Sequence, residues 1–231
     1  MKYLRAVVMF INTLVMYLGL PLLGWGIDDL GGFFSLDPRS GYALLVVACG
    51  FAVGYQAIDA PEGIRGSRGE GHKRVRSQSI VSIVIILLLF AALIFLPFAD
   101  RRSIGVMIGG QAAAIRWLGL VLFGLGCALV FWSGILLGRL YSAEVTIQKN
   151  HRLITVGVYR HIRHPRYLGG IILAIGLSLL FRSWIGLAAS FLFIGVVLSR
   201  IKDEEALLHS EFGQEWETYC QQSWRLIPCL Y

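Results

Sequence analysis

The stretch at residues 117–138, WLGLVLFGLGCALVFWSGILLG, contains no charged residue. Folded as a helix, it is long enough to cross the roughly 30 Å of hydrocarbon in a bilayer. Three further charge-free runs of comparable length occupy residues 6–27, 41–58 and 79–99. The sequence therefore predicts four membrane-spanning helices.

Two shorter apolar runs, at residues 167–181 and 183–199, follow the four long ones and are separated only by Arg182. Such a short connection between two apolar segments is typical of an antiparallel helical hairpin. We predict a hairpin that enters the membrane and returns to the side from which it came.

Residues 200–222 have the pattern of an amphipathic helix, which Gly213 would break near its middle. Side chains that recur every four residues lie along one side of a helix. That row begins with charged residues and ends with apolar ones: Arg200, Glu204, Leu208, Phe212 and Trp216. The predicted fold class is all-α: a polytopic membrane helical bundle with four spanning helices, a C-terminal helical hairpin and an amphipathic cytosolic helix.

The composition agrees with a membrane protein, since 56% of the 231 residues are hydrophobic and only 15% are charged. The net charge of +7 arises from loops between the apolar runs, so it does not indicate a nucleic-acid partner. The four cysteines form no C-x-x-C pair, which argues against a disulfide framework and a zinc site.

Basic residues in the loops predict the orientation of the chain. Lysine and arginine precede the first run and crowd the loop at residues 60–78, whereas the loop at residues 28–40 holds more aspartate than arginine. Because cytosolic loops carry excess Lys and Arg, we place the N-terminus and residues 60–78 in the cytosol. The third loop departs from this rule, with Asp100 opposed by Arg101, Arg102 and Arg116.

Four crossings return the chain to the cytosol before residue 148, and the hairpin leaves the C-terminal segment there as well. We expect a multi-pass integral membrane protein, in the plasma membrane if the chain is prokaryotic or the endoplasmic reticulum if it is eukaryotic. Residues 1–115 form an N-terminal part of spans and loops. Residues 116–231 hold most of the unusual polar residues and form the candidate catalytic domain.

The segment QKNHRLITVGVYRHIRHPRYLGG, at residues 148–170, lies between the last long run and the hairpin. Pro165 fits the first turn of a helix, and His164 before it is then favoured in an extended conformation. The start of a helix presents N–H groups that bind a carboxylate or a phosphate. The alternative is an interfacial loop whose arginines reach the lipid headgroups.

Three of the five histidines, His151, His161 and His164, lie in this segment, so a metal site has to be considered. The spacing H-E-x-x-H is absent, and only His209 could join them from a distant position, which argues against a metal centre. We predict no strands. A strand followed by Gly-x-Gly-x-x-Gly, as in soluble nucleotide-binding folds, is therefore excluded.

Arg200 and Glu204 lie one helical turn apart directly after the hairpin, next to Glu205. Their simplest role is a surface ion pair worth a few tenths of a kcal/mol. Alternatively, the two adjacent acids accept a cationic ligand at the membrane edge.

Four motifs occur in order: HRLITVGVY at residues 151–159, RHPRYLG at 163–169, RIKDEE at 200–205 and FGQEW at 212–216. Together they resemble the isoprenylcysteine carboxyl methyltransferase family, part of a broader membrane methyltransferase group that includes phospholipid methyltransferases. The resemblance covers about residues 130–228. It implies an enzyme that transfers a methyl group from S-adenosylmethionine to a lipophilic acceptor at the cytosolic membrane face.

The resemblance also implies roles for residues on both arms of the hairpin. Glu204 would bind the amino group of S-adenosylmethionine, and Arg200 would hold the carboxylate of the acceptor. The other cofactor-binding residues that it implies are Gln148, His151, Arg152, Leu153, Ile154, Tyr159, His164, Pro165, Arg166 and Tyr167. The connection from Gln148 to His151 is shorter than in the animal enzymes.

The residue types agree with this chemistry. S-adenosylmethionine carries two cationic groups and a carboxylate, so it needs an acid together with cationic or N–H donors. A carboxylate acceptor, such as a prenylcysteine, requires no general base. An amine or thiol acceptor would have to lose a proton, for which Glu205 or His164 is the nearest candidate.

Several alternatives remain open from the sequence. The acceptor could be a phospholipid amine or a small thiol, and an NADPH-dependent reductase or isomerase could use a related membrane scaffold. A transporter or non-catalytic module is disfavoured, because the four long apolar runs contain no charged residue for an ion path.

Overall fold

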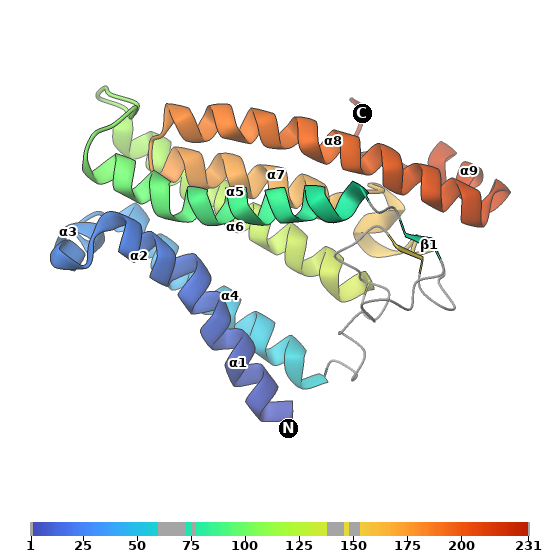
Figure 1. The fold of residues 1–231 in the computed structure, drawn as a ribbon, viewed down its shortest axis with the longest axis horizontal. Coiled ribbons are helices and arrows are strands. Elements are labelled where there is room, and N and C mark those ends of the chain that lie inside the picture. Colours follow the sequence, from blue (N-terminus) through green and yellow to red (C-terminus); the bar gives the residue numbers. More distant parts are fainter. Residues whose placement is uncertain (1, 60–72, 75–76, 138–145, 148–152, 231) are drawn as a thin grey trace.

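The charge-free runs form the long helices of the computed structural model, which describes residues 2–59, 73–74, 77–137, 146–147 and 153–230 (Figure 1). Five described helical stretches are long and apolar enough to cross a membrane: Lys2–Trp25, Asp37–Ile58, Ile83–Arg101, Ala112–Leu137 and Trp184–Phe212. The all-α polytopic bundle is therefore confirmed, with one candidate span more than the four predicted.

The first span is not a uniform α-helix. It consists of α1 (Lys2–Leu14), the π-helical segment η1 (Val15–Gly19) and α2 (Leu20–Trp25). Pro21 lies in the first turn of α2, where its missing N–H interrupts the regular hydrogen-bond ladder. The short helices η2 (Ile27–Asp29) and α3 (Leu30–Phe34) then lead into the second span.

The next long helices are α4 (Asp37–Asp59), α5 (Ser77–Arg101) and α6 (Ala112–Leu137). After the short helix η4 (Gly157–Arg160) comes the hairpin, formed by α7 (Pro165–Leu180) and α8 (Trp184–Phe212). Helix α1 packs on α4, α2 on α5, and α6 on α7. Helices α5, α7 and α8 lie side by side along the bundle (Figure 1).

Glycines allow α6 and α7 to approach closely. A Cβ atom at Gly126 would lie 2.7 Å from the carbonyl oxygen of Gly169, and one at Gly176 would lie 2.4 Å from the backbone nitrogen of Phe123. Any side chain at these positions would therefore force the two helices apart. Such contacts between small residues are typical of helix packing in membranes.

Helix α8 corrects the expected end of the hairpin. We expected one helix at residues 183–199 and a separate amphipathic helix from Arg200, but α8 continues without a break to Phe212. Residues 200–212 contain neither glycine nor proline, so nothing in the backbone stops the helix there. The predicted break at Gly213 is confirmed, because this residue has a φ of 48° and separates α8 from α9 (Gln214–Gln221).

A two-residue antiparallel ladder joins β1 (Lys73–Arg74) to β2 (Thr146–Ile147), with Lys73 opposite Ile147. It corrects the prediction that the chain has no strands. Two paired residues are too few to produce the alternation by which a strand is recognised in a sequence. Most of the loop at residues 60–78 lies outside the described residues.

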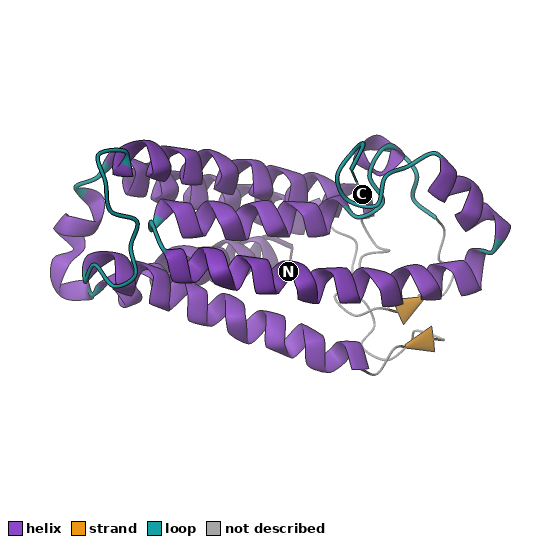
Figure 2. Ribbon diagram, turned by 90° about the horizontal axis from the view of Figure 1, so that it is seen from above, coloured by secondary structure: helices purple, strands orange, loops and turns teal. Residues whose placement is uncertain are grey.

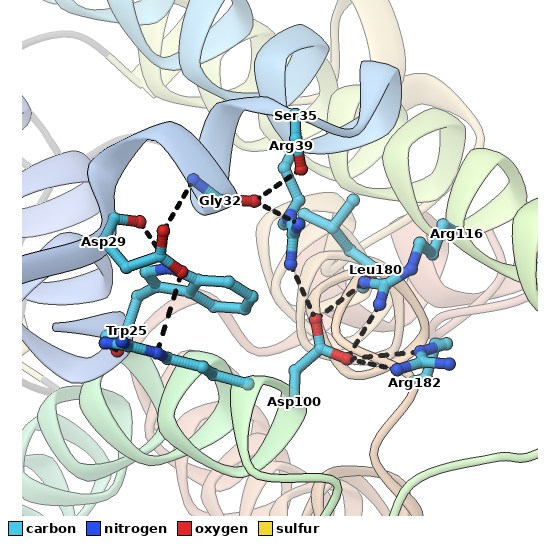
Figure 3. A network of polar contacts seen from close by, with 10 residues as sticks. Trp25, Asp29, Gly32, Ser35, Arg39, Asp100, Arg116, Leu180 and Arg182 are labelled. Atoms are coloured by element: carbon cyan, nitrogen blue, oxygen red, sulfur yellow. Dashed lines mark hydrogen bonds and ion pairs between the residues drawn. The ribbon is translucent and has the colours of Figure 1, made fainter.

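Four charged residues meet in a buried group at one end of the bundle, which we call the Asp100 cluster (Figure 3). Asp100, in the last turn of α5, accepts hydrogen bonds from Arg39 of α4 at 3.3 Å and from Arg116 of α6 at 2.8 Å. It also accepts one at 2.9 Å from Arg182, in the turn between α7 and α8. The Asp100 side chain is 0% exposed. This single carboxylate therefore ties four parts of the chain together.

The Asp100 cluster changes the interpretation of the third loop. Asp100 and Arg116 were counted as loop charges that disturbed the topology rule, but both lie inside helices and are buried. Arg182, which separated the two hairpin runs, has the same partner. Asp100 lies beside the turn between α7 and α8, whereas the candidate site described next lies toward the other end of α8, where α9 follows (Figure 1). Seen from above, loops and turns gather at both ends of the bundle (Figure 2).

Candidate functional site

The segment that leads into α7 is held by the end of the chain. Pro165 occupies the first turn of α7, as predicted, and His164 precedes it with φ −123° and ψ 54°. The backbone N–H of Arg163 donates to the carbonyl of Trp224, and that of His164 donates to the carbonyl of Arg225. The residues after α9 thus fix the start of the hairpin.

Glu205 is the centre of an ion-pair group just behind this helix start. Its carboxylate contacts Nε of Arg163 at 3.2 Å, Nε2 of His164 at 3.2 Å and Nη2 of Arg225 at 2.6 Å. The Glu205 side chain is 11% exposed. These contacts join α8, the loop before α7 and the residues after α9. Within the group, Glu205 and His164 are direct partners.

Glu204, the neighbouring acid on α8, belongs to a different chain of contacts. The hydroxyl of Tyr167 donates to Oε2 of Glu204 at 2.7 Å and accepts a hydrogen bond from Nε of Arg200 at 2.7 Å. Arg200 is buried. An acid and a base one turn apart on α8 are therefore bridged by a phenol from α7.

The Arg200–Tyr167–Glu204 chain lies at one end of a cavity of about 670 Å³. Lining residues recur at helical spacing on α7 and α8, which places them on one face of each helix. On α7 they are Tyr167, Gly170, Leu173, Ala174, Leu177 and Ser178. On α8 they are Ile185, Gly186, Ala189, Ser190, Phe193, Val197, Arg200, Glu204, Leu207 and Leu208.

The cavity is polar at one end and apolar along most of its length. From Arg200 back to Gly186 along α8 the distance is about 21 Å at 1.5 Å per residue, a large part of the hydrocarbon thickness. Helix α5 forms a third apolar wall, from Ile85 to Leu96. A ligand with a charged head and a hydrocarbon chain would match this division.

Most of the predicted site residues that the structure describes surround this one cavity. They are Leu153, Ile154, Tyr159, His164, Arg166, Tyr167, Arg200 and Glu204. Pro165 begins α7 beside them, and Glu205 binds His164. The remaining predictions, Gln148, His151 and Arg152, lie outside the described residues.

The cavity also has walls formed by residues to which the sequence assigned no role in the site. Trp216 and Tyr219 of α9 line it, and the hydroxyl of Tyr219 donates to the carbonyl of Tyr159 at 2.6 Å. Burial raises the pKa of Tyr159, and it raises that of Tyr219 to about 12, so both phenols are neutral donors. The predicted apolar row of α8 and α9 pointed toward Trp216, but α5 carried no signal beyond its hydrophobicity.

No group of three or more metal-ligating side chains was found among the described residues. At this end the described cavity lining has one carboxylate and several basic groups beside phenols: Glu204, Arg163, His164, Arg166, Arg200, Tyr159, Tyr167 and Tyr219. The arrangement suits ligands that carry both a positive and a negative charge.

The fold and the site together define a polytopic membrane protein in which a charged pocket continues into an apolar cavity between helices. Residues 117–210 match the family model of the isoprenylcysteine carboxyl methyltransferase (ICMT) family. The matched residues include three of the four motifs, at residues 151–159, 163–169 and 200–205, in which the sequence resembles this family.

Curated relatives agree with the family match. The chain is 33% identical over 119 residues to a probable protein-S-isoprenylcysteine O-methyltransferase of Oryza sativa subsp. japonica, covering 50% of this chain and 62% of the relative. It is 39% identical over 96 residues to the protein-S-isoprenylcysteine O-methyltransferase of Schizosaccharomyces pombe, and the alignment covers 40% of this chain and 41% of the relative. The matches thus span less than two thirds of these relatives.

A solved structure supports the fold over the whole chain. The eukaryotic intramembrane Ras methyltransferase ICMT aligns with 99% of this chain and 84% of its own, with a TM-score of 0.54 and 22% sequence identity. The likeness includes the N-terminal helices, which the sequence motifs did not cover. It establishes a shared arrangement of helices.

Proposed function

We propose that this protein is an S-adenosylmethionine-dependent methyltransferase that modifies a lipophilic carboxylate at the cytosolic membrane face. A prenylated cysteine is the acceptor class we favour. The observation that carries the proposal is the Arg200–Tyr167–Glu204 chain at the head of an apolar cavity. The family match of residues 117–210 supports the same reaction.

The donor side of the proposed site fits the charges of S-adenosylmethionine. Glu204 would accept the ammonium group, and Arg166 and the loop before α7 would face the carboxylate. Leu153, Ile154 and Tyr159 offer apolar and aromatic surface for the adenosine. When bound, S-adenosylmethionine supplies an electrophilic methyl group on a sulfonium.

On the acceptor side, Arg200 would hold the acceptor carboxylate while the apolar walls of α5, α7 and α8 hold its hydrocarbon chain. Burial of Arg200 strengthens its attraction for an anion, because little water screens the charge. A chain placed along α7 and α8 would enter from the hydrocarbon of the bilayer. Such an acceptor would not need to leave the membrane.

A carboxylate acceptor also agrees with the state of the nearest bases. Glu205 is engaged by Arg163, His164 and Arg225, and His164 is engaged by Glu205. A base committed to two arginines is a poor proton acceptor. Methylation of a carboxylate needs no proton removed, so orientation of the reactants and exclusion of water can supply most of the catalysis.

Equilibrium binding of S-adenosylhomocysteine to the purified protein tests this proposal. We expect saturable binding, because the product retains the ammonium and carboxylate groups for which the site is suited. The absence of binding at millimolar ligand would refute the proposed cofactor. If S-adenosylhomocysteine binds, lipid profiling of native membranes with a labelled methyl donor would identify the acceptor.

A further inference from the structure

The hydroxyl of Tyr167 occupies an unusual position between two opposite charges. Arg200 and Glu204 are one turn apart on α8, a spacing at which such residues commonly pair with each other. Here the phenol from α7 accepts from Arg200 at 2.7 Å and donates to Glu204 at 2.7 Å. The two charges are linked through a third group that can pass polarisation between them.

We propose that Tyr167 is a positioning residue that couples binding of a cation at Glu204 to binding of an anionic acceptor at Arg200. The inference rests on the proposed function, which assigns those two ligands to those two side chains. It adds that the two binding events are energetically linked through one hydroxyl group.

The direction of the coupling follows from the order of donors and acceptors. In a chain of hydrogen bonds each bond polarises the next, so a strong acceptor at Glu204 makes the Tyr167 oxygen a better acceptor for Arg200. A cation bound at Glu204 weakens that carboxylate as an acceptor. The hold of Tyr167 on Arg200 then weakens, and the guanidinium is more available to an incoming carboxylate.

The coupling must be reciprocal, because it is a property of the equilibrium between the two sites. The anionic acceptor should therefore tighten cofactor binding by the same factor as the cofactor tightens acceptor binding. Couplings between sites typically change affinity by about 5- to 150-fold. We expect at least the lower value in the native protein.

The experiment measures the dissociation constant of N-acetyl-S-farnesylcysteine with and without saturating S-adenosylhomocysteine. In the native protein we expect the added ligand to lower this constant about fivefold or more. The coupling ratio is the dissociation constant without S-adenosylhomocysteine divided by that with it. In Tyr167→Phe the ring remains and the hydroxyl is lost, so this ratio should fall toward one. A ratio in Tyr167→Phe equal to the native ratio would overturn the inference, as would a native ratio of one.

Two controls sharpen the result. Tyr219→Phe removes another phenol hydroxyl from the cavity wall, one that contacts the carbonyl of Tyr159. It should keep the native ratio, and loss of the ratio there would count against a specific role for Tyr167. A desamino analogue of S-adenosylhomocysteine lacks the ammonium group and should produce no coupling in the native protein.

The outcomes also separate this inference from the proposed function. If S-adenosylhomocysteine does not bind the native protein, the proposed function itself fails. If both ligands bind but Tyr167→Phe keeps the native ratio, only the coupling fails. Should Tyr167→Phe not fold, replacement of Tyr167 by fluorotyrosine makes the hydroxyl more acidic, and an unchanged ratio would again reject the inference.

Discussion

The two ends of the bundle each place one acidic side chain among three basic ones. At one end Asp100 is surrounded by Arg39, Arg116 and Arg182. At the other, Glu205 is surrounded by Arg163, His164 and Arg225. Both groups join segments distant in sequence, so each fixes the architecture at its end.

The two ends differ in what surrounds these ion-pair groups: packed side chains at one end and a cavity at the other. Around Asp100 the structure records buried side chains and aromatic contacts, such as the guanidinium of Arg39 4.1 Å from the ring centroid of Trp25. Beside Glu205, a second acid, Glu204, faces a cavity of about 670 Å³. Buried charge is common to both ends, so the cavity beside Glu204 is what distinguishes the candidate site from the Asp100 cluster.

The largest effect should come from removing the centre of the structural end. Asp100→Ala would leave three arginines without their shared carboxylate, and breaking a buried ion pair in this way typically costs about 3–5 kcal/mol. We expect a large drop in the thermal unfolding temperature in detergent. Asp28→Ala, which removes an exposed partner of Arg101, is the matched control and should change it little. Similar stability of both variants would contradict the assigned role of Asp100.

Substitutions at the end that holds the candidate site should change ligand binding more than stability. Glu204→Ala should weaken S-adenosylhomocysteine binding by about 30-fold or more, since losing a partner of a buried charge costs about 2 kcal/mol or more. Arg200→Ala should lower turnover while the affinity for S-adenosylhomocysteine is retained. Equal loss of cofactor affinity in the two variants would overturn this division of roles.

A smaller effect is expected where helices α6 and α7 connect the two ends. Gly126→Ala would place a methyl group 2.7 Å from the carbonyl oxygen of Gly169, and such overpacking costs about 1–3 kcal/mol. Gly124→Ala is the matched control on the same helix, because its Cβ would meet Leu45 at an ordinary 3.6 Å. Unfolding temperatures that fall equally in both would show that the close approach is not what matters.

The smallest effect concerns the exposed ion pair at the Asp100 end. Hydrogen bonding to Arg101 lowers the pKa of Asp28 from 3.8 to about 2. A lowered folded-state pKa means that the contribution of this group is present above the unfolded value and is lost as pH falls toward 2. The unfolding temperature of Asp28→Asn should therefore differ slightly from that of the native protein above pH 4, with the difference vanishing near pH 2. A difference that grows on acidification would exclude this explanation.

The spans could be predicted because a bilayer leaves few choices: a charge-free run of sufficient length has to form a helix within it. The Asp100 cluster could not be predicted, because its members come from four segments: Arg39, Asp100, Arg116 and Arg182. The sequence around each of them does not indicate which residues it contacts. The continuity of α8 was missed because polarity changes at Arg200 while the backbone preference does not.

The candidate site was predictable where its residues belong to recognisable motifs. His164, Tyr167 and Glu204 were identified before their common cavity was known. The wall formed by α5 was not predictable. Ile85, Leu89 and Phe95 are ordinary residues of an apolar span, and only the fold places them at the cavity with α7 and α8. Which apolar residues line a cavity is decided by tertiary packing.

The unbroken α8 has a consequence for the membrane around the protein. Its 29 residues correspond to about 44 Å of helix, longer than the roughly 30 Å of hydrocarbon in an average bilayer. One rigid element therefore carries the turn beside Asp100 at its start and Glu204 near its end. A helix of fixed length responds to a thinner or thicker bilayer by changing its tilt. We expect the thickness of the host membrane to set the depth at which Arg200 and Glu204 meet the lipid surface.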